Sequence, residues 1–252
     1  MNLHTDRAAW LLGGQTLCHP EPPRPARPRR LVLLGAPGVG KGTQAGLLSA
    51  DCGACQLSTG DVFRHALSHP ADEVMSPAMQ TALDCMHRGE LVHDETVLAL
   101  ITERIRCLVC RGGFLLDGFP RTVVQAEALN LLLIEHQVKL DAVVSYEFPV
   151  EALAARTSGR RTCPGCKAVY HLSAKPPHVE GICDRCGGKL VQRADDQPEA
   201  ARHRLVVYEQ CTAPLIHHYH DLGLLVSVDA SGTPEEVFLR TAAALVVHDR
   251  SA

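Results

Sequence analysis

Short apolar runs alternate with longer amphipathic stretches over most of the chain. Runs with the length of buried strands occur at Leu31–Leu34, Phe114–Leu116, Ala142–Tyr146 and Leu224–Val228, and helix-like stretches separate them. Strands that are apolar on both sides are typical of a parallel sheet covered by helices on both faces. The pattern therefore predicts an α/β fold built on a parallel sheet.

Two segments do not follow this alternation. Residues 159–194 are rich in Cys, Gly and Pro, which predicts a small inserted subdomain. Residues 1–30 contain five Pro and five Arg but no Lys or Ser, and we expect a disordered tail because Pro at this density disfavours a packed element. A mitochondrial transit peptide is the alternative, which Asp6, Glu21 and the missing Ser weaken.

Composition and charge narrow the class of protein. The chain has 252 residues, of which 46% are hydrophobic, and a net charge of −3. This composition excludes wholesale disorder, and the negative charge disfavours a protein that acts mainly by binding nucleic acid. No apolar run approaches the ~18 residues of a membrane span, and no convincing export signal precedes the fold. We therefore expect a cytoplasmic protein that binds neither nucleic acid nor membranes.

A glycine-rich turn follows the first apolar run and precedes a helical pattern. Residues 35–43 read Gly-Ala-Pro-Gly-Val-Gly-Lys-Gly-Thr, which matches the P-loop pattern in the context that it requires. Glycines let backbone N–H groups converge on phosphate oxygens, Lys41 reaches the β- and γ-phosphates, and Thr43 can help to position Mg²⁺. The turn predicts a nucleoside triphosphate site formed by Gly35, Gly38, Val39, Gly40, Lys41, Gly42 and Thr43.

Further motifs occur in order around this turn. They are LSTGDVFR at Leu57–Arg64, GELVHDE at Gly89–Glu95, LLDGFPRT at Leu115–Thr122, Gly159-Arg160-Arg161 followed by CPGC at 163–166 and CDRCGG at 183–188, and QRADDQPEAARHRL at Gln192–Leu205. From about Leu31 to Leu245 the chain closely resembles the adenylate kinase family in its long form with a zinc-bearing lid. The resemblance implies a P-loop three-layer fold over residues 31–252, with a core of 31–58, 94–158 and 195–252, an AMP-binding helical flap of 59–93 and a lid of 159–194.

The resemblance also implies a reaction, the reversible Mg²⁺-dependent transfer of the terminal phosphoryl group of ATP to AMP by a monomer, which gives two ADP. The acceptor phosphate is already an oxyanion, so catalysis requires charge neutralisation, in-line positioning and exclusion of water rather than a general base. Arginine suits this task because its planar fork binds phosphate oxygens bidentately. By resemblance, the catalytic cations are Lys41, Arg121, Arg156, Arg160, Arg193 and Arg204.

The other site residues are implied by the same resemblance. Beyond the P-loop, ATP would contact Arg156, Arg160, Val169 and Tyr170. AMP would contact Thr59, Arg64, Glu90, Leu91, Val92, Gly118, Phe119, Pro120, Arg121, Gln125, Arg193 and Arg204. Asp61 and Asp117 would order waters around Mg²⁺. Thr59 and Gln125 would select adenine, because a Gln amide can pair bidentately with an adenine edge.

Four cysteines have the spacing of a structural metal site. Cys163 and Cys166 form one C-x-x-C pair, and Cys183 and Cys186 form another. Four thiolates fill the tetrahedron of Zn²⁺ and leave no position for substrate. A nucleic-acid-binding zinc ribbon is the alternative, but residues 163–186 carry too few basic side chains to favour it.

Two more C-x-x-C pairs lie outside the family's pattern. Cys52/Cys55 and Cys107/Cys110 each precede a predicted strand, and these strands are expected to be parallel neighbours. A second metal site or a redox pair at the sheet edge is the functional hypothesis. The alternative is that these cysteines are small buried hydrophobic residues.

Two rival functions remain open at this stage. The first is another nucleoside monophosphate kinase of the same architecture with a different base preference. The second is a non-catalytic regulator that binds nucleotide and zinc. The intact Lys41 and the full set of arginines argue against the regulator, because a protein without transfer activity has no physical need for every phosphate clamp.

Overall fold

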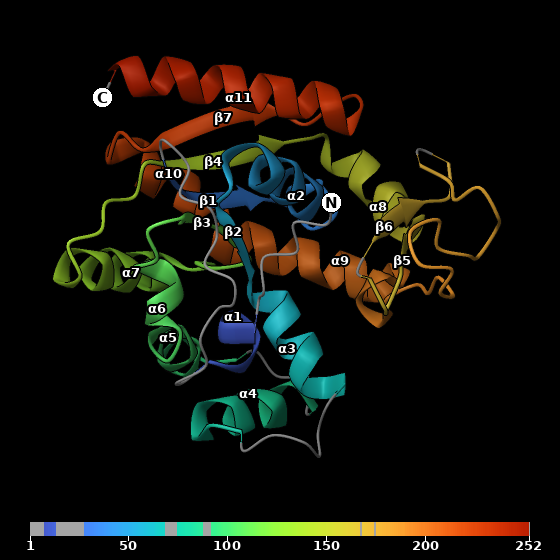
Figure 1. Cartoon of the computed structure of the whole chain (residues 1–252), viewed down its shortest axis with the longest axis horizontal. Helices are drawn as coiled ribbons and strands as arrows, with labels where there is room; N and C mark the ends of the chain where they lie inside the picture. Colours follow the sequence, from blue (N-terminus) through green and yellow to red (C-terminus); the bar gives the residue numbers. More distant parts are fainter. Residues whose placement is uncertain are drawn as a thin grey trace.

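The computed structural model describes residues 8–13, 28–68, 75–87, 92–166, 168–173 and 175–251. Its central sheet contains five parallel strands in the order β2-β3-β1-β4-β7 (Figure 1). The strands are β1 Arg29–Gly35, β2 Cys55–Ser58, β3 Gly113–Asp117, β4 Ala142–Glu147 and β7 Leu225–Asp229. The prediction of a parallel sheet is confirmed, and each of the four apolar runs lies in a strand, although Leu224 precedes β7.

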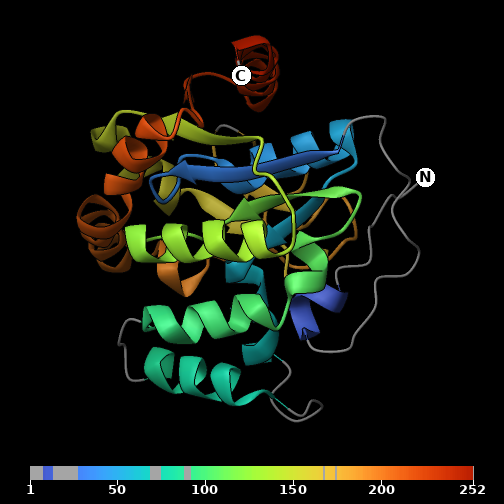
Figure 2. The same ribbon diagram turned by 90° about the vertical axis from the view of Figure 1, so that its left-hand side faces the viewer.

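Both faces of the sheet are covered, as the continuous apolar runs require. In β1, Val32 and Leu34 point into one core while Leu31 and Leu33 point into the other, and all four are buried. Helices α7 (Val123–Glu135) and α10 (Pro214–Asp221) cover the first face, and α2 (Lys41–Cys52) and α11 (Pro234–Ser251) cover the second (Figure 2). Within the described ranges no helix is long and apolar enough to cross a membrane.

A group of helices projects from one side of the sheet, and its first two members lie within residues 59–93, the range predicted for the flap. It contains α3 (Thr59–Ser68), α4 (Pro77–His87), α5 (Asp94–Thr102) and α6 (Ile105–Leu108), which lie below the sheet in Figure 1. Helix α3 begins directly after β2. The first residue of α3 is therefore fixed at the carboxyl end of a central strand, where ligands bind in open α/β sheets.

The lid lies at the end of α8 (Val150–Ser158), away from the flap in Figure 1. It contains two short antiparallel strands, β5 (Arg160–Thr162) and β6 (Val169–His171). The chain leaves the lid through the 3-10 turn η1 (Ala194–Asp196) and enters α9 (Pro198–Val207), and the π-helical turn η2 (Tyr208–Thr212) joins α9 to α10.

The prediction of an unpacked tail over residues 1–30 is wrong for the part that the structure describes. Helix α1 (Ala8–Leu12) packs against α3 and α6, and only 1% of the Trp10 surface is exposed. In addition, β1 begins at Arg29, inside the predicted tail. The Pro-rich composition concealed α1, because five apolar residues between polar segments give too short a pattern to indicate a helix.

Candidate active site

The P-loop joins β1 to α2 at the carboxyl edge of the sheet. Helix α2 begins at Lys41, and Gly40 precedes it in a left-handed conformation without a side-chain cap. The first N–H groups of α2 therefore have no side chain competing for them at the cap position, and they lie at the positive end of the helix dipole. This arrangement suits a phosphate group.

Two glycines of the loop are required by close packing. A Cβ on Gly38 would lie 2.3 Å from Thr157 Oγ1, and one on Gly35 would lie 2.7 Å from the Tyr146 carbonyl oxygen. Both glycines also have positive φ angles, 87° and 136°, which residues with a side chain rarely adopt. The loop can therefore pass this closely over β4 and α8 only with glycine at these positions.

Lys41 lies folded over the loop that precedes it. Its Nζ donates to the carbonyl oxygens of Gly35 at 2.6 Å and Ala36 at 3.1 Å. Burial lowers the pKa of Lys41 to about 8, an effect that nearby Asp117 opposes and nearby arginines strengthen. An ammonium group with so low a pKa gains much from an anionic partner, because that partner stabilises its charged form.

This shift predicts a pH dependence of ATP binding. Below about pH 8, Lys41 is charged with and without ATP, so it contributes no pH dependence to binding. Above about pH 8, ATP must bind together with a proton, and its affinity should fall by up to about tenfold per pH unit. Titrations of MgATP between about pH 7 and pH 9 measure this, and Lys41→Arg should remove the dependence because arginine stays charged. An equal slope in Lys41→Arg would contradict it.

The predicted phosphate-binding cations come together around Lys41. Arg121, Arg160 and Arg204 all lie close enough to Lys41 to disfavour its charged form. Burial is the largest cause that lowers the pKa of Arg193, to about 10, and the charge of Arg160 contributes next. Arg64 lowers the pKa of the nearby arginines in the same way. A cluster of mutually repelling cations has a strong physical reason to bind a polyanion.

Two aspartates hold the arginines at the base of the lid. Asp196 is fully buried and accepts two hydrogen bonds from Arg160, one of them from Nε at 2.8 Å. Asp195 accepts a hydrogen bond from Arg204 Nη1 at 2.8 Å. The sequence analysis did not assign either carboxylate a role, although both lie within three residues of Arg193 in the chain. They offset the repulsion in the cluster and fix the positions of two guanidinium groups.

Arg156 occupies a separate position beside the P-loop. Its guanidinium stacks 4.7 Å from the centre of the Phe148 ring, and Nη1 donates to the Ala230 carbonyl at 3.3 Å. A Cβ on Gly40 would lie 4.0 Å from Arg156 Nη2. The predicted arginine therefore lies within reach of phosphates in the loop, and burial lowers its pKa.

Thr59 and Gln125 both lie beside the segment that follows β3, Thr59 next to Gly118 and Gln125 bonded to Arg121. Thr59 is 6% exposed, and among the described residues its Oγ1 has no hydrogen-bond partner. A buried hydroxyl without a partner is costly unless a ligand satisfies it. Gln125 is held differently: its Oε1 accepts from the Arg121 backbone N–H at 2.8 Å, and its Nε2 donates to Asp94 Oδ1 at 2.7 Å. One donor and one acceptor site of this amide remain for a base.

Asp94 was missed by the sequence analysis and connects the elements of this pocket. One oxygen accepts from Gln125, and the other accepts from the Thr122 hydroxyl at 3.0 Å. Thr122 in turn caps α7 by accepting from the Gln125 backbone N–H. Asp94 opens α5, so it fixes this helix relative to α7. The sequence signal was weak, because 31 residues separate Asp94 from Gln125.

Asp61 and Asp117, the predicted magnesium-side carboxylates, have different surroundings. Asp61 forms an ion pair with Arg64 at 2.7 Å. Asp117 ends β3, raises the pKa of Lys41 by its charge, and would lie 3.5 Å from a Cβ on Gly42. Of the two carboxylates, Asp117 is therefore the one that lies beside the P-loop.

The remaining predicted AMP contacts follow β3 or precede α5. Gly118 has a φ angle of 86°, and a Cβ there would lie 2.7 Å from Thr59 Oγ1. Phe119 is a core residue with 1% exposure, so only its backbone is available to a nucleotide. Val92 and Pro120 are described as well, whereas Glu90 and Leu91 lie outside the described residues.

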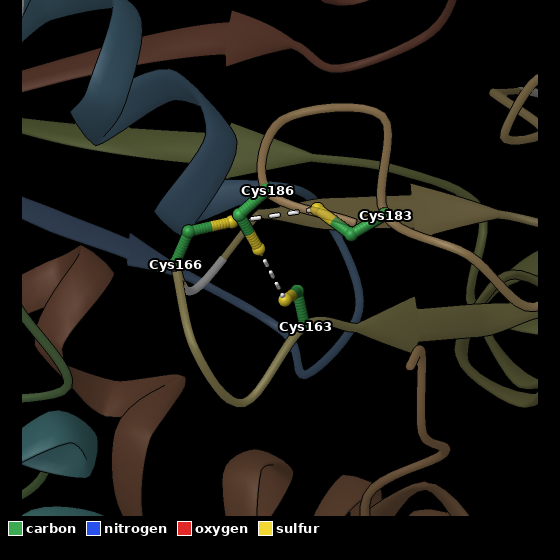
Figure 3. Close-up of side chains that lie close together, drawn as sticks. All are labelled: Cys163, Cys166, Cys183 and Cys186. Carbon is green, nitrogen blue, oxygen red and sulfur yellow. Dashed lines mark hydrogen bonds between the residues drawn. The ribbon is translucent and has the colours of Figure 1, made fainter. Parts of the chain in front are cut away.

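The four predicted lid cysteines converge on one point. Their Sγ atoms all lie within 4.8 Å of one another, with Cys163 and Cys186 at 3.4 Å and Cys166 and Cys183 at 3.4 Å (Figure 3). Four sulfurs bound to Zn²⁺ at about 2.3 Å would be separated by about 3.8 Å, so the group has the size of such a site. The four cysteines can therefore hold a metal ion.

Tyr170 belongs to the interior of the lid. Its side chain is 5% exposed, and its hydroxyl lies 3.5 Å from Cys183 Sγ and accepts from the Asp184 backbone N–H. Its ring therefore packs beside the cysteine group inside the lid, so the Tyr170 backbone and the half-buried Val169 are the parts that remain for the predicted ATP contact. A hydrogen bond from Tyr170 is among the causes that lower the pKa of Cys183 to about 6, against the opposing effect of burial.

The second cysteine hypothesis has a mixed outcome. Strands β2 and β3 are parallel neighbours as expected, with Cys55 beside Phe114. However, Cys52, Cys55, Cys107 and Cys110 do not form a group of metal-ligating atoms. Among the described residues, the other such group is His217, His220 and Asp221, which is exposed on α10. The structure therefore gives no support to a second four-cysteine site.

The fold and this site define a P-loop phosphotransferase that acts on nucleotides. A family model described as adenylate kinase matches residues 33–224. The adenylate kinase of Carboxydothermus hydrogenoformans is 48% identical over 209 residues, which cover 83% of this chain and 95% of that protein. Those of Acidothermus cellulolyticus (48% over 216 residues, 86% and 97%) and Archaeoglobus fulgidus (45% over 208 residues, 82% and 94%) are similar. The chain belongs to the adenylate kinase family and is a nucleoside monophosphate kinase.

Proposed function

We propose that this chain transfers the terminal phosphoryl group of ATP to AMP and forms two ADP. The observation that carries the proposal is the cluster of Lys41 and five arginines at the carboxyl edge of the sheet, listed as Arg64, Arg121, Arg160, Arg193 and Arg204. This excess of cations matches two phosphate chains brought end to end. The family's relatives are named as adenylate kinases, which supports the same reaction.

In this proposal the P-loop binds the ATP phosphates and Lys41 follows the transferred group. Lys41 now donates to two backbone carbonyls, and it would exchange them for phosphate oxygens. The AMP phosphate would lie between Arg121 and Arg204, whose charges repel each other in the substrate-free site. An oxygen of AMP then attacks the terminal phosphorus in line, and the bond to the ADP oxygen breaks.

Arg160 of β5 and Arg204 of α9 would couple nucleotide binding to closure of the lid. They are bound to Asp196 and Asp195 of η1, which hold them in place before nucleotide arrives. A nucleotide phosphate would be a second anionic partner for each of these guanidinium groups, and it would draw β5 and α9 toward the P-loop. Closure of this kind excludes water, which would otherwise accept the phosphoryl group.

Two metals belong to this proposal. Mg²⁺ bound with ATP would supply charge neutralisation at the β- and γ-phosphates, and Thr43 and Asp117 would hold it or its waters. Zn²⁺ fits the four lid cysteines in size and in ligand chemistry. Because all four ligands come from protein, that metal would be structural. The enzyme would act as a cytoplasmic monomer that needs neither nucleic acid nor membrane.

Asp94 is expected to set the affinity for AMP through Gln125. Asp94→Asn should raise the KM for AMP about tenfold, because the acceptor becomes neutral and only one oxygen remains to accept from both Gln125 and Thr122, so the Gln125 amide is held less firmly. The KM for ATP should stay the same. Steady-state kinetics with each nucleotide varied in turn measure this, and Asp84→Asn on α4 is the matched control. Equal changes in both KM values would contradict this role.

The stoichiometry of the products tests the proposed function. Incubation with MgATP and AMP should yield two ADP for each AMP consumed, and ADP alone should yield ATP and AMP. Without AMP, hydrolysis of ATP should be slower by orders of magnitude, because water lacks the positioning that the arginines provide. Binding of both nucleotides without any ADP would overturn the proposal and favour the non-catalytic regulator.

A further inference from the structure

Helix α1 is a well-packed part of the molecule that the proposed reaction does not use. It precedes residues 33–224, which match the family model. In Figure 1 it lies between α3 on one side and α5 and α6 on the other. Ala9 and Trp10 are buried at 6% and 1% exposure, whereas Leu12 is 40% exposed. Trp10 is the only tryptophan in the sequence.

Trp10 is bonded to the residue that precedes Thr59. Its indole Nε1 donates to the Ser58 carbonyl oxygen at 2.9 Å, a buried bond that joins segments 48 residues apart. Ser58 is the last residue of β2, and Thr59 is the first of α3. The indole therefore holds the backbone at the point where the acceptor-site threonine is presented.

Arg104 holds the other side of α1. It is 3% exposed and donates from Nε to the Trp10 carbonyl at 2.7 Å, and from Nη1 to the Leu100 carbonyl at 2.8 Å. Gly13, at the end of α1 with a φ angle of 73°, permits this approach, since a Cβ there would lie 3.1 Å from Arg104 Cζ. Helix α1 thus bridges the start of α3 and the end of α5.

These two helices enclose a narrow cavity that Trp10 closes. Its lining from α1 and α3 is Trp10, Thr59, Val62 and Phe63, and its lining from α5 and the following residues is Val97, Leu100, Ile101 and Arg104. The Thr59 hydroxyl without a partner belongs to this lining. Trp10 therefore borders the same apolar space as the residue expected to contact adenine, and it fixes the separation of α3 from α5.

We propose that Trp10 is a positioning residue for the acceptor nucleotide, acting through Ser58 and Thr59 and through the spacing of α3 and α5. This inference rests on the proposed function, in which Thr59 contacts the AMP base. Loss of the indole bond would let the Ser58–Thr59 backbone shift, and binding of AMP would weaken. Binding of ATP would not change, because the P-loop follows β1 on another part of the sheet edge.

The test combines kinetics with the intrinsic fluorescence of the full chain. Trp10→Phe keeps an aromatic ring in the cavity and removes the donor to Ser58, so we expect the KM for AMP to rise about three- to tenfold with kcat and the KM for ATP unchanged. Leu12→Ala, on the exposed side of the same helix, is the matched control and should change neither KM. In the unaltered chain, AMP should change the Trp10 emission at saturation, and ATP should not.

Three outcomes would overturn the inference. They are an unchanged KM for AMP in Trp10→Phe, equal changes in both KM values, and an emission that does not respond to AMP. A lower melting temperature with an unchanged KM for AMP would show a purely structural role and also counts against it. If the unaltered chain forms no ADP, the proposed function fails, and this result is distinct from a kinase whose Trp10 variants behave normally.

Discussion

Replacing Arg121 with alanine is expected to lower kcat by about 10²- to 10³-fold, because a preorganised cation at the transferred group is worth about that much. Arg121 is held at this position by its own Nε, which donates to the Gly118 carbonyl at 2.9 Å, and by its backbone N–H, which donates to Gln125. Its side chain is exposed in the substrate-free protein. The loss should therefore fall on transfer and on AMP binding, and ATP binding should persist.

Two further variants make this result specific. Arg121→Lys keeps the charge but not the bidentate fork, so it should recover only part of the activity. Arg202→Ala removes an exposed arginine from α9, outward from the cluster, and should leave the rate as it is. A rate for Arg121→Ala within a fewfold of the unaltered enzyme would show that this arginine does not touch the reacting groups.

Loss of the lid metal is expected to have the largest effect on stability. The lid has a very small core: among its described residues, the buried apolar cluster consists of Cys163, Tyr170, Cys183 and Leu190, and two of these are cysteines of the metal-site group. A subdomain with so little apolar burial depends on metal, whose binding supplies about 10–16 kcal/mol in zinc-finger peptides. Cys183→Ala should therefore unfold the lid and abolish transfer, because β5 carries Arg160.

Metal content and thermal unfolding measure this prediction. The unaltered chain should contain one zinc per molecule, Cys183→Ala should contain none, and its melting temperature should be lower by roughly 10 °C. Cys211→Ala, a half-buried cysteine outside the lid, is the control and should keep its zinc. A chain that is purified without metal and is insensitive to chelator would contradict the structural role. Two zinc ions per chain would revive the second cysteine site.

The parts of the site that could be predicted are those encoded in short stretches of sequence. The P-loop places its glycines, Lys41 and Thr43 within nine consecutive residues, so local backbone geometry determines where they lie. The same holds for each C-x-x-C turn. The sheet was predictable for a related reason, since a strand buried on both faces must be apolar at every position.

The parts that could not be predicted depend on partners far apart in the chain. Asp94 meets Gln125 across 31 residues, and Asp196 meets Arg160 across 36. An aspartate at the start of a helix has an ordinary reason to be there, its charge favouring the helix dipole, so the sequence pattern does not reveal a second partner. The contact between Trp10 and Ser58 was even harder to predict, because a Pro-rich segment that indicated disorder separates the two residues.

The acceptor preference of the enzyme tests the central claim most directly. The measurement is kcat/KM with MgATP as donor and with AMP, GMP, CMP, UMP and dTMP offered separately. Thr59 and Gln125 predict that AMP is preferred by at least about tenfold, since one unpaired buried group costs about 1–3 kcal/mol. Preference for another monophosphate would contradict the assignment of these residues to adenine, and the absence of transfer to every acceptor would contradict the proposed function.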